Sequence, residues 1–171
     1  VNTIVNDNGK LTGYITDGEG FVNNLKDHGI DIKGKKITVA GGGGAATAIQ
    51  VQCALDGARE ITIFNIKDAF FERTLQTAEK IRAAVPGIVV NVYDIADTAK
   101  MTEEIQSSDI FANATIVGMK PMDDQSVVKD LSAFRPGLVV CDAVYNPEET
   151  KMLREAREAG CTCIGGKGML C

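Results

Sequence analysis

The stretch Lys36–Ala46 is the feature that most constrains what this chain can fold into. It reads KITVAGGGGAA: an apolar run typical of a buried strand, then four glycines, then small residues that predict a helix over 45–54. Gly41 would allow a sharp turn, Gly43 has no Cβ to keep a pyrophosphate from the backbone, and Ala46 would let the helix pack closely on the strand. Free amides at the positive end of that helix would bind phosphates. This order favours a dinucleotide-binding unit over a glycine-rich turn that binds nothing.

Strands and helices alternate along the rest of the chain. Further strands are predicted at 61–65, 88–93, 109–113, 138–141 and 161–164, and helices at 70–85, 99–105 and 148–159. Two strands, 1–5 and 10–14, come earlier, and Thr16 with Glu19 has the spacing of a capping box for a helix that ends at Gly29. Because the later strands are nearly continuous apolar runs, we expect an α/β fold. It would be a doubly wound, mostly parallel six-stranded sheet of order 3-2-1-4-5-6, with its ligand at the carboxyl ends of the strands.

Composition excludes several classes of function. With 171 residues, 44% of them hydrophobic, the chain can bury the core of one domain. A net charge of -5 and the lack of a basic run argue against nucleic acid as a partner, and no apolar stretch is long enough to span a membrane. The single histidine, His28, is predicted at a helix end rather than as a ligand. The five cysteines, which are Cys53, Cys141, Cys161, Cys163 and Cys171, show neither the spacing of a zinc site nor that of a disulfide framework. We therefore expect that the protein binds no metal, that its thiols are reduced and that it is located in the cytoplasm.

Seven short stretches, in the same order along the chain, resemble motifs of the shikimate dehydrogenase family. They are VNTI at 1–4, GYITDG at 13–18, the glycine turn at 41–46, NAT at 113–115, GMKP at 118–121, VYNP at 144–147 and GML at 168–170. The stretch FNIKDAFF at 64–71 resembles more narrowly the quinate/shikimate dehydrogenase branch. The resemblance implies an N-terminal substrate domain, of which residues 1–16 would be the end. It also implies a Rossmann-type NAD(P)-binding domain, 17–171, that lacks its C-terminal segment.

The family reduces 3-dehydroshikimate with a nicotinamide cofactor, or oxidises shikimate or quinate in reverse, on the way to chorismate and the aromatic amino acids. Asp17 matches the aspartate of the family's catalytic pair, whose lysine would precede Val1. A carboxylate beside the reacting alcohol can take part in the proton transfer that accompanies hydride transfer; the alternative is that Thr16 and Asp17 only cap a helix. Asn2, Thr16 and Tyr145 match positions that contact the substrate. Their alternatives are a strand-end amide, a cap and a core tyrosine.

The resemblance also implies the residues that contact the cofactor. They are Gly42, Gly43, Gly44, Ala45, Asn65, Ile66, Lys67, Asp68, Ile116, Ala143, Val144, Tyr145, Asn146 and Gly166. Asp68, about 24 residues past the glycine turn, would meet the adenosine ribose and repel a 2′-phosphate, unless it only caps the next helix. Ile66 stands where NADP-preferring members commonly carry arginine, whereas Lys67 could still attract a phosphate. We therefore expect NAD to be preferred, with use of NADP left open.

Two functions stay open at this stage. In the first, the chain belongs to an NAD(P)-dependent shikimate/quinate dehydrogenase, with shikimate or quinate as its small-molecule substrate and a homodimer as a compatible assembly. In the second, the chain as given is a nucleotide-binding module without turnover of its own. Ile15, in place of the asparagine most common before Thr16 and Asp17, is a departure from the family's pattern that bears on the substrate site.

Overall fold

Six parallel strands form the central sheet of the structure, a computed structural model that describes residues 1–170. Cys171, one of the five cysteines, lies outside the described residues. The strands are β3 (Lys36–Ala40), β4 (Glu60–Asn65), β5 (Val89–Asp94), β6 (Ile110–Asn113), β7 (Val139–Asp142) and β8 (Thr162–Ile164). Their order is β5-β4-β3-β6-β7-β8, and every neighbouring pair is parallel. Counted from β3 this order is 3-2-1-4-5-6, so the predicted doubly wound Rossmann-type fold is confirmed.

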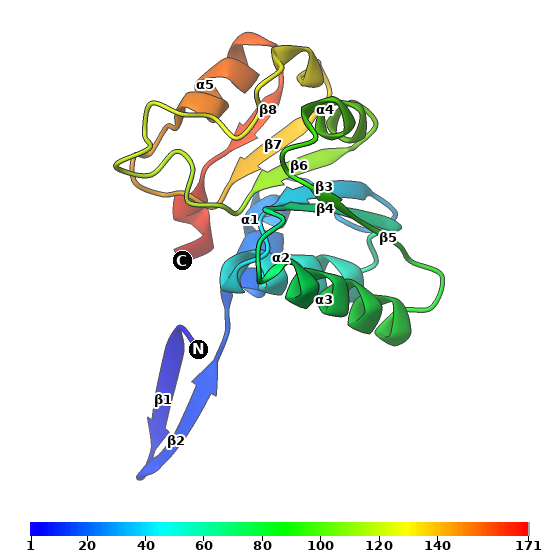
Figure 1. Cartoon of the computed structure of the whole chain (residues 1–171). Coiled ribbons are helices and arrows are strands. Elements are labelled where there is room, and N and C mark those ends of the chain that lie inside the picture. Colours follow the sequence, from blue (N-terminus) through cyan, green and yellow to red (C-terminus); the bar gives the residue numbers. More distant parts are fainter. Residues whose placement is uncertain (171) are drawn as a thin grey trace.

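Helices cover both faces of the sheet (Figure 1). On one face lie α1 (Asp17–Asp27), α2 (Gly44–Leu55) and α3 (Phe71–Ala84), and on the other lie α4 (Thr98–Gln106) and α5 (Lys151–Glu158). Two short 3-10 helices complete the elements, η1 (Leu131–Ala133) and η2 (Gly166–Leu170). The helices therefore shield the sheet from water, and its carboxyl edge is where loops and cavities gather.

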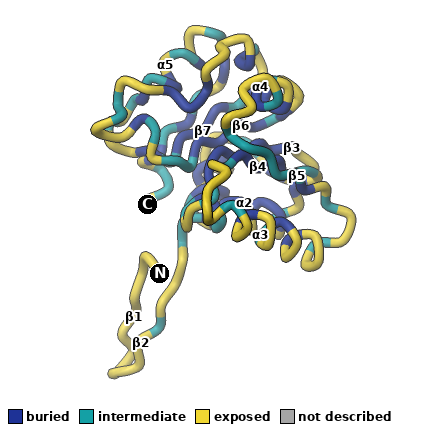
Figure 2. Tube along the Cα trace, viewed as in Figure 1, coloured by how far each residue is buried: buried dark blue, intermediate teal, exposed yellow. Residues whose placement is uncertain are grey.

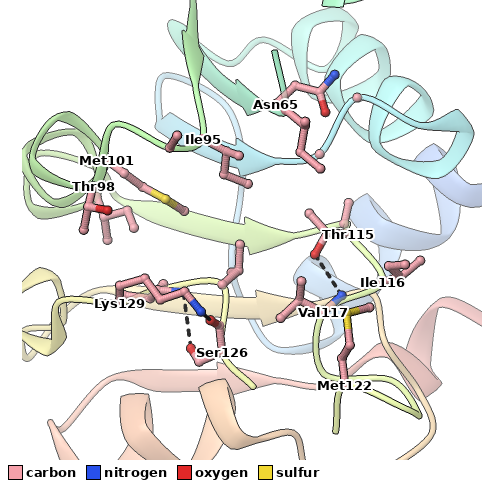
Figure 3. A pocket seen from close by; sticks show the side chains of 18 of the residues that line it. Asn65, Ile95, Thr98, Met101, Thr115, Ile116, Val117, Met122, Ser126 and Lys129 are labelled. Atoms are coloured by element: carbon pink, nitrogen blue, oxygen red, sulfur yellow. Dashed lines mark hydrogen bonds between the residues drawn. The ribbon is translucent and has the colours of Figure 1, made fainter. Parts of the chain in front are cut away.

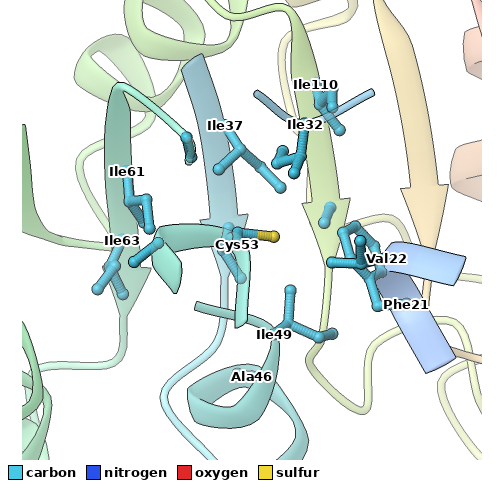
Figure 4. Close-up of a cluster of buried hydrophobic side chains, with 14 of the residues drawn as sticks. Phe21, Val22, Ile32, Ile37, Ala46, Ile49, Cys53, Ile61, Ile63 and Ile110 are labelled. Atoms are coloured by element: carbon cyan, nitrogen blue, oxygen red, sulfur yellow. The ribbon is translucent and has the colours of Figure 1, made fainter. Parts of the chain in front are cut away.

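Each face of the sheet packs its own hydrophobic core, and Figure 2 shows the strands as the most buried part of the chain. Under α1 and α2, the side chains of Ile37, Ile61 and Ile110 form one cluster with Ile49 and Cys53 (Figure 4). The cluster under α4 and α5 contains Ala40, Phe64, Met101, Ile105, Phe111, Val140, Met152 and Leu153. Burial on both faces explains why the strands read as nearly continuous apolar runs.

An antiparallel hairpin, β1 (Thr3–Asp7) and β2 (Lys10–Tyr14), extends away from the sheet (Figures 1 and 2). Its turn falls at the DNG sequence that typically marks such a turn. Ile4 and Leu11 are each 69% exposed, so within the described residues the hairpin packs on no core. The assignment of 1–16 to the end of a preceding domain stays a prediction.

One predicted helix cap and one predicted helix start differ from the structure. Thr16 precedes α1, but its side chain makes no capping hydrogen bond and instead donates to Asn2 Oδ1 (3.2 Å), so the predicted capping box is wrong. The helix predicted over 148–159 begins only after Thr150, which has an extended backbone and caps α5 by accepting a hydrogen bond from Leu153 N (3.4 Å). At α5 the capping side chain, and not the apolar periodicity, decides where the helix begins.

Candidate functional site

The inner half of the glycine turn, between β3 and α2, is fixed by contact with protein. Gly41 has a φ of +122°, which favours glycine, and a Cβ there would lie 2.7 Å from the carbonyl oxygen of Ala114. A Cβ at Gly42 would overlap the side chains of Asn65 and Thr74, at 2.5 Å from Thr74 Oγ1. No side chain fits at either residue, which explains why glycine stands at both.

The outer half of the turn faces open space. A Cβ at Gly43 or Gly44 would meet nothing within 4 Å. Gly43 is the N-cap of α2 and offers no side chain to its first amides, while Ala46 is fully buried beneath the turn. The open backbone and the uncapped amides fit the needs of a bound phosphate, which is attracted by the positive end of a helix.

A first cavity, of about 540 Å³, opens beside the glycine turn, and we call it the apolar cavity (Figure 3). It lies at the carboxyl ends of β4, β5 and β6 and is bounded by the segment 122–129. The predicted cofactor residues that line it are Gly42, Gly43, Asn65, Ile66 and Ile116. The sequence analysis missed most of its apolar lining, which includes Ile95, Met101, Met122, Val127 and Val128. Such a surface suits a flat aromatic ring.

A second cavity, of about 530 Å³, lies between the glycine turn and α3, and we call it the polar cavity. Asp68 lines it, and its Oδ1 accepts a hydrogen bond from Phe70 N (2.8 Å) just before α3. Arg73 and Lys80 of α3 line it as well, and the Arg73 guanidinium lies 5.9 Å from the centre of the Phe70 ring. The sequence analysis missed both cations, because only the orientation of α3 shows that they face this cavity.

A third cavity, of about 680 Å³, separates the start of the chain from η2 and the end of β7, and we call it the hairpin cavity. Asn2 connects its polar groups: Asn2 Nδ2 donates to Asp17 Oδ2 (2.9 Å), and Asn2 Oδ1 accepts from Thr16 N (3.1 Å). Tyr145 lines the same cavity and is 53% exposed, so the core-tyrosine alternative is wrong. The structure thus brings all four predicted substrate residues together, beside the predicted cofactor residues Ala45, Ala143 and Gly166.

Three predicted contact residues line none of these three cavities. Lys67 and Asn146 lie on exposed loops, and Val144 is 6% exposed within the core. The backbone of Gly166 packs closely against the backbone of Ala143, since a Cβ at Gly166 would lie 2.6 Å from the carbonyl oxygen of Ala143. Val144 therefore supports this region through packing, and only its backbone could serve a ligand.

His28, Cys53 and Cys141 line none of these three cavities and have structural surroundings. A ring nitrogen of His28 lies 2.8 Å from the carbonyl oxygen of Asn24 at the C-terminus of α1, which confirms the helix-end interpretation. Burial raises the pKa of the Cys53 and Cys141 thiols far above the ordinary range, which keeps them protonated and unreactive.

Among residues 1–170, no group of three or more His, Cys, Asp or Glu side chains could hold a metal ion. No helix in this part of the chain has the length and apolar character to cross a membrane.

Comparison with known proteins gives one consistent result. The chain is 48% identical over 170 residues to a quinate/shikimate dehydrogenase of Escherichia coli O139:H28 (strain E24377A / ETEC). It superposes with a TM-score of 0.92 and 48% identity on shikimate 5-dehydrogenase of Listeria monocytogenes in complex with shikimate and NAD. A shikimate dehydrogenase in complex with NADP+ gives a TM-score of 0.82 and 32% identity. No family model matches.

The coverage of these matches is unequal on the two sides. Each match covers 99% of this chain, but 59% of the Escherichia coli protein, 58% of the Listeria chain and 56% of the chain solved with NADP+. The resemblance to this family, predicted from seven short motifs, is therefore confirmed along nearly the whole chain. The chain spans a little over half the length of these relatives.

Proposed function

We propose that this chain, whose similarity to shikimate and quinate dehydrogenases covers 99% of its length, is the cofactor-binding part of such an enzyme. The whole enzyme would transfer a hydride between NAD(P) and the hydroxyl-bearing carbon of shikimate or quinate. The observation that carries this proposal is the open outer half of the glycine turn, at Gly43 and Gly44. It lies where the strand order reverses, between β4 and β6 on either side of β3, which is where folds of this type bind dinucleotides.

The residues around the turn fit an extended dinucleotide. The uncapped amides of Gly44 and Ala45 would hold the pyrophosphate, and the apolar cavity on one side offers a surface for an aromatic ring. Asp68 in the polar cavity is suited to accept hydrogen bonds from ribose hydroxyls. When bound, the nicotinamide cofactor would supply the acceptor or donor of the hydride.

Asp17 is the catalytic residue that we propose within this chain. Its carboxylate faces the hairpin cavity, and the Asn2 amide that donates to Oδ2 holds it in one orientation. An ionised carboxylate in this place can accept the proton of the substrate hydroxyl while the hydride leaves the same carbon. Thr16 and Tyr145 would bind the remaining hydroxyl and carboxylate groups of the substrate.

NAD is the cofactor that we propose to be preferred, with NADP as a second ligand. Ile66 is 61% exposed beside the glycine turn and offers no charge to a 2′-phosphate, and Asp68 would repel one. Arg73, a cation in the same polar cavity, opposes that repulsion and supports some binding of NADP. The chain's relatives include one solved with NAD and one solved with NADP+.

Two measurements test this function. Calorimetric titration of the chain should show a tighter dissociation constant for NAD than for NADP. In the full-length protein, NADH formation with shikimate and with quinate should fall by about 100-fold or more in Asp17→Asn, with little change in NAD affinity, because asparagine keeps the shape of the carboxylate but accepts no proton. Near-normal turnover of this variant would leave Asp17 as a helix-end residue. A chain that binds neither cofactor would refute the proposal as a whole.

A further inference from the structure

The buried carboxylate of Asp142 lies between the loop after β6 and the segment after β7, which line the apolar cavity and the hairpin cavity. Asp142 ends β7 and is 2% exposed. Its Oδ1 accepts hydrogen bonds from Asn113 Nδ2 and Val144 N (both 3.0 Å), and its Oδ2 accepts one from Thr150 Oγ1 (2.6 Å). All three donors are neutral, and they come from β6, from the segment after β7 and from the N-cap of α5. Burial raises the pKa of Asp142 to about 6, against the effect of these hydrogen bonds.

Asn113 extends this network to the loop after β6. It is the register partner of Asp142 and is 1% exposed. Its Oδ1 accepts hydrogen bonds from Thr115 N (3.1 Å) and Thr115 Oγ1 (2.7 Å), while its Nδ2 also donates to the carbonyl of Val117 (3.0 Å). Thr115 Oγ1 in turn accepts from Val117 N (3.1 Å), the contact drawn in Figure 3. The backbone of 114–117, one wall of the apolar cavity, is thus tied to the Asp142 carboxylate.

Thr150 adds a packing contact to the same loop. It is fully buried and caps α5 while donating to Asp142. Gly118, at a φ of +102°, lies against it: a Cβ on Gly118 would be 3.1 Å from Thr150 Cγ2 and 4.0 Å from Asp142 Oδ2. None of Asn113, Asp142 and Thr150 lines the apolar, polar or hairpin cavity. Their effect on a ligand must therefore pass through the segments that they hold.

We propose that Asp142, together with Asn113 and Thr150, positions one wall of the apolar cavity and one wall of the hairpin cavity for binding of the cofactor. The loop 114–117 bounds the apolar cavity, and the segment 143–145 contributes to the hairpin cavity. Asn113 connects the first of these to Asp142 Oδ1, and Val144 N of the second donates to the same oxygen. Thr150 donates to Oδ2 and so holds the carboxylate in the orientation that joins the two segments. A carboxylate can only accept hydrogen bonds, which fixes the direction of every bond around it. This inference rests on the proposed function, since it concerns binding of the same cofactor.

The test compares two buried threonines in the described chain. Thr150→Val removes the hydroxyl that donates to Asp142, whereas Thr150→Ser keeps it. Thr38→Val is the matched control, because Thr38 is also fully buried and its Oγ1 bonds a single side chain, Ser108 Oγ (2.8 Å), in the middle of the sheet. The NAD dissociation constant of each variant is measured by calorimetry at a temperature where circular dichroism shows it to be folded.

The expected result is a rise of about tenfold in the dissociation constant for Thr150→Val, the size of effect that follows from losing one hydrogen bond to a charged group. Thr150→Ser and Thr38→Val should stay within about twofold of the parent. If Thr150→Val does not fold, Asp142→Asn replaces it, because its amide meets the Thr150 hydroxyl with a donor, and the same rise is expected. An unchanged constant in these variants, or an equal rise in Thr38→Val, would overturn the inference. A parent chain that binds no NAD would overturn the proposed function, and this inference with it.

Discussion

Gly43→Ala should weaken NAD binding while leaving the fold almost as stable as before. The added methyl would meet no protein atom within 4 Å, and the backbone angles of Gly43, φ -78° and ψ -172°, suit alanine. Alanine is a poorer N-cap than glycine but restricts the unfolded chain more, so two effects of up to about 1 kcal/mol each oppose one another. The methyl does occupy the open face where a phosphate would approach the backbone. We expect NAD affinity to fall at least about tenfold, or ~1.4 kcal/mol.

Gly42→Ala is the matched change one residue earlier, and it should instead lower the stability of the fold. Its methyl would stand 2.5 Å from Thr74 Oγ1 and displace the Asn65 amide, which donates to that oxygen (2.9 Å). Overpacking costs about 1–3 kcal/mol and a lost hydrogen bond about 0.5–1.5 kcal/mol. A loss of about 2–4 kcal/mol corresponds to a fall in Tm of roughly 5–15 °C for a domain of this size.

Thermal unfolding followed by circular dichroism and NAD titration by calorimetry separate the two effects. The reasoning requires that Gly43→Ala change affinity more than Tm, and that Gly42→Ala lower Tm clearly. If Gly43→Ala binds NAD as the parent does, the phosphate does not approach this face, and the carrying observation of the proposed function is lost. If Gly42→Ala melts with the parent, the packing of the inner half of the turn is not what the structure describes.

Two further predictions concern cofactor choice and the opposite end of the sheet. Ile66→Arg combined with Asp68→Ser should shift the NAD/NADP affinity ratio towards NADP, because a cation is gained and a repelling carboxylate lost; an unchanged ratio in calorimetry would assign phosphate discrimination to Arg73 instead. Lys36→Met should cost about 1–3 kcal/mol in urea unfolding, because it removes the ammonium 2.7 Å from the buried Glu104 and leaves that carboxylate with Lys100, at 3.0 Å, as its remaining cation. Burial favours a higher pKa for Glu104, but hydrogen bonds from Lys36 and Lys100 hold the pKa of this carboxyl below the ordinary 4.5. The stability from this contact should therefore be complete above that pH and be lost as the pH falls below it, and a loss under 1 kcal/mol at neutral pH would contradict this account.

The sheet could be predicted from the sequence because its signals are local and repeated. Apolar runs of strand length alternate with helix periods, and the connections between them leave few arrangements open. The glycine turn at 41–44 fixed which strand comes first, and the order of the others followed from the general topology of such folds. The resemblance to a family then gathered Asn2, Asp17 and Tyr145 into one expected site, and the structure brings these side chains to one cavity.

Most of the apolar cavity could not be predicted, because its wall depends on how the irregular segment 122–129 folds back over the strand ends. Val127 and Val128 carry no periodicity that distinguishes them from ordinary core. The capping box failed for a related reason: the Thr16 side chain finds a partner in Asn2, which is distant in the sequence. Asp142 did give a signal, an acidic residue directly after an apolar run, but burial alone shows that it faces inward.

Buried charges have different partners at the two ends of the sheet, and this difference supports the assignment of the cofactor site to the carboxyl end. At the amino end, Lys36 Nζ lies 2.7 Å from Glu104 and 3.1 Å from Glu60, so opposite charges compensate one another. At the carboxyl end, Asp142 is bonded by neutral donors, an arrangement that costs free energy compared with a carboxylate in water. Asp142 joins two cavity walls and is not an ordinary core residue. Such a cost in free energy is expected where a ligand requires those walls in a fixed place. Asp142→Asn should accordingly damage cofactor affinity more than it damages the stability of the fold.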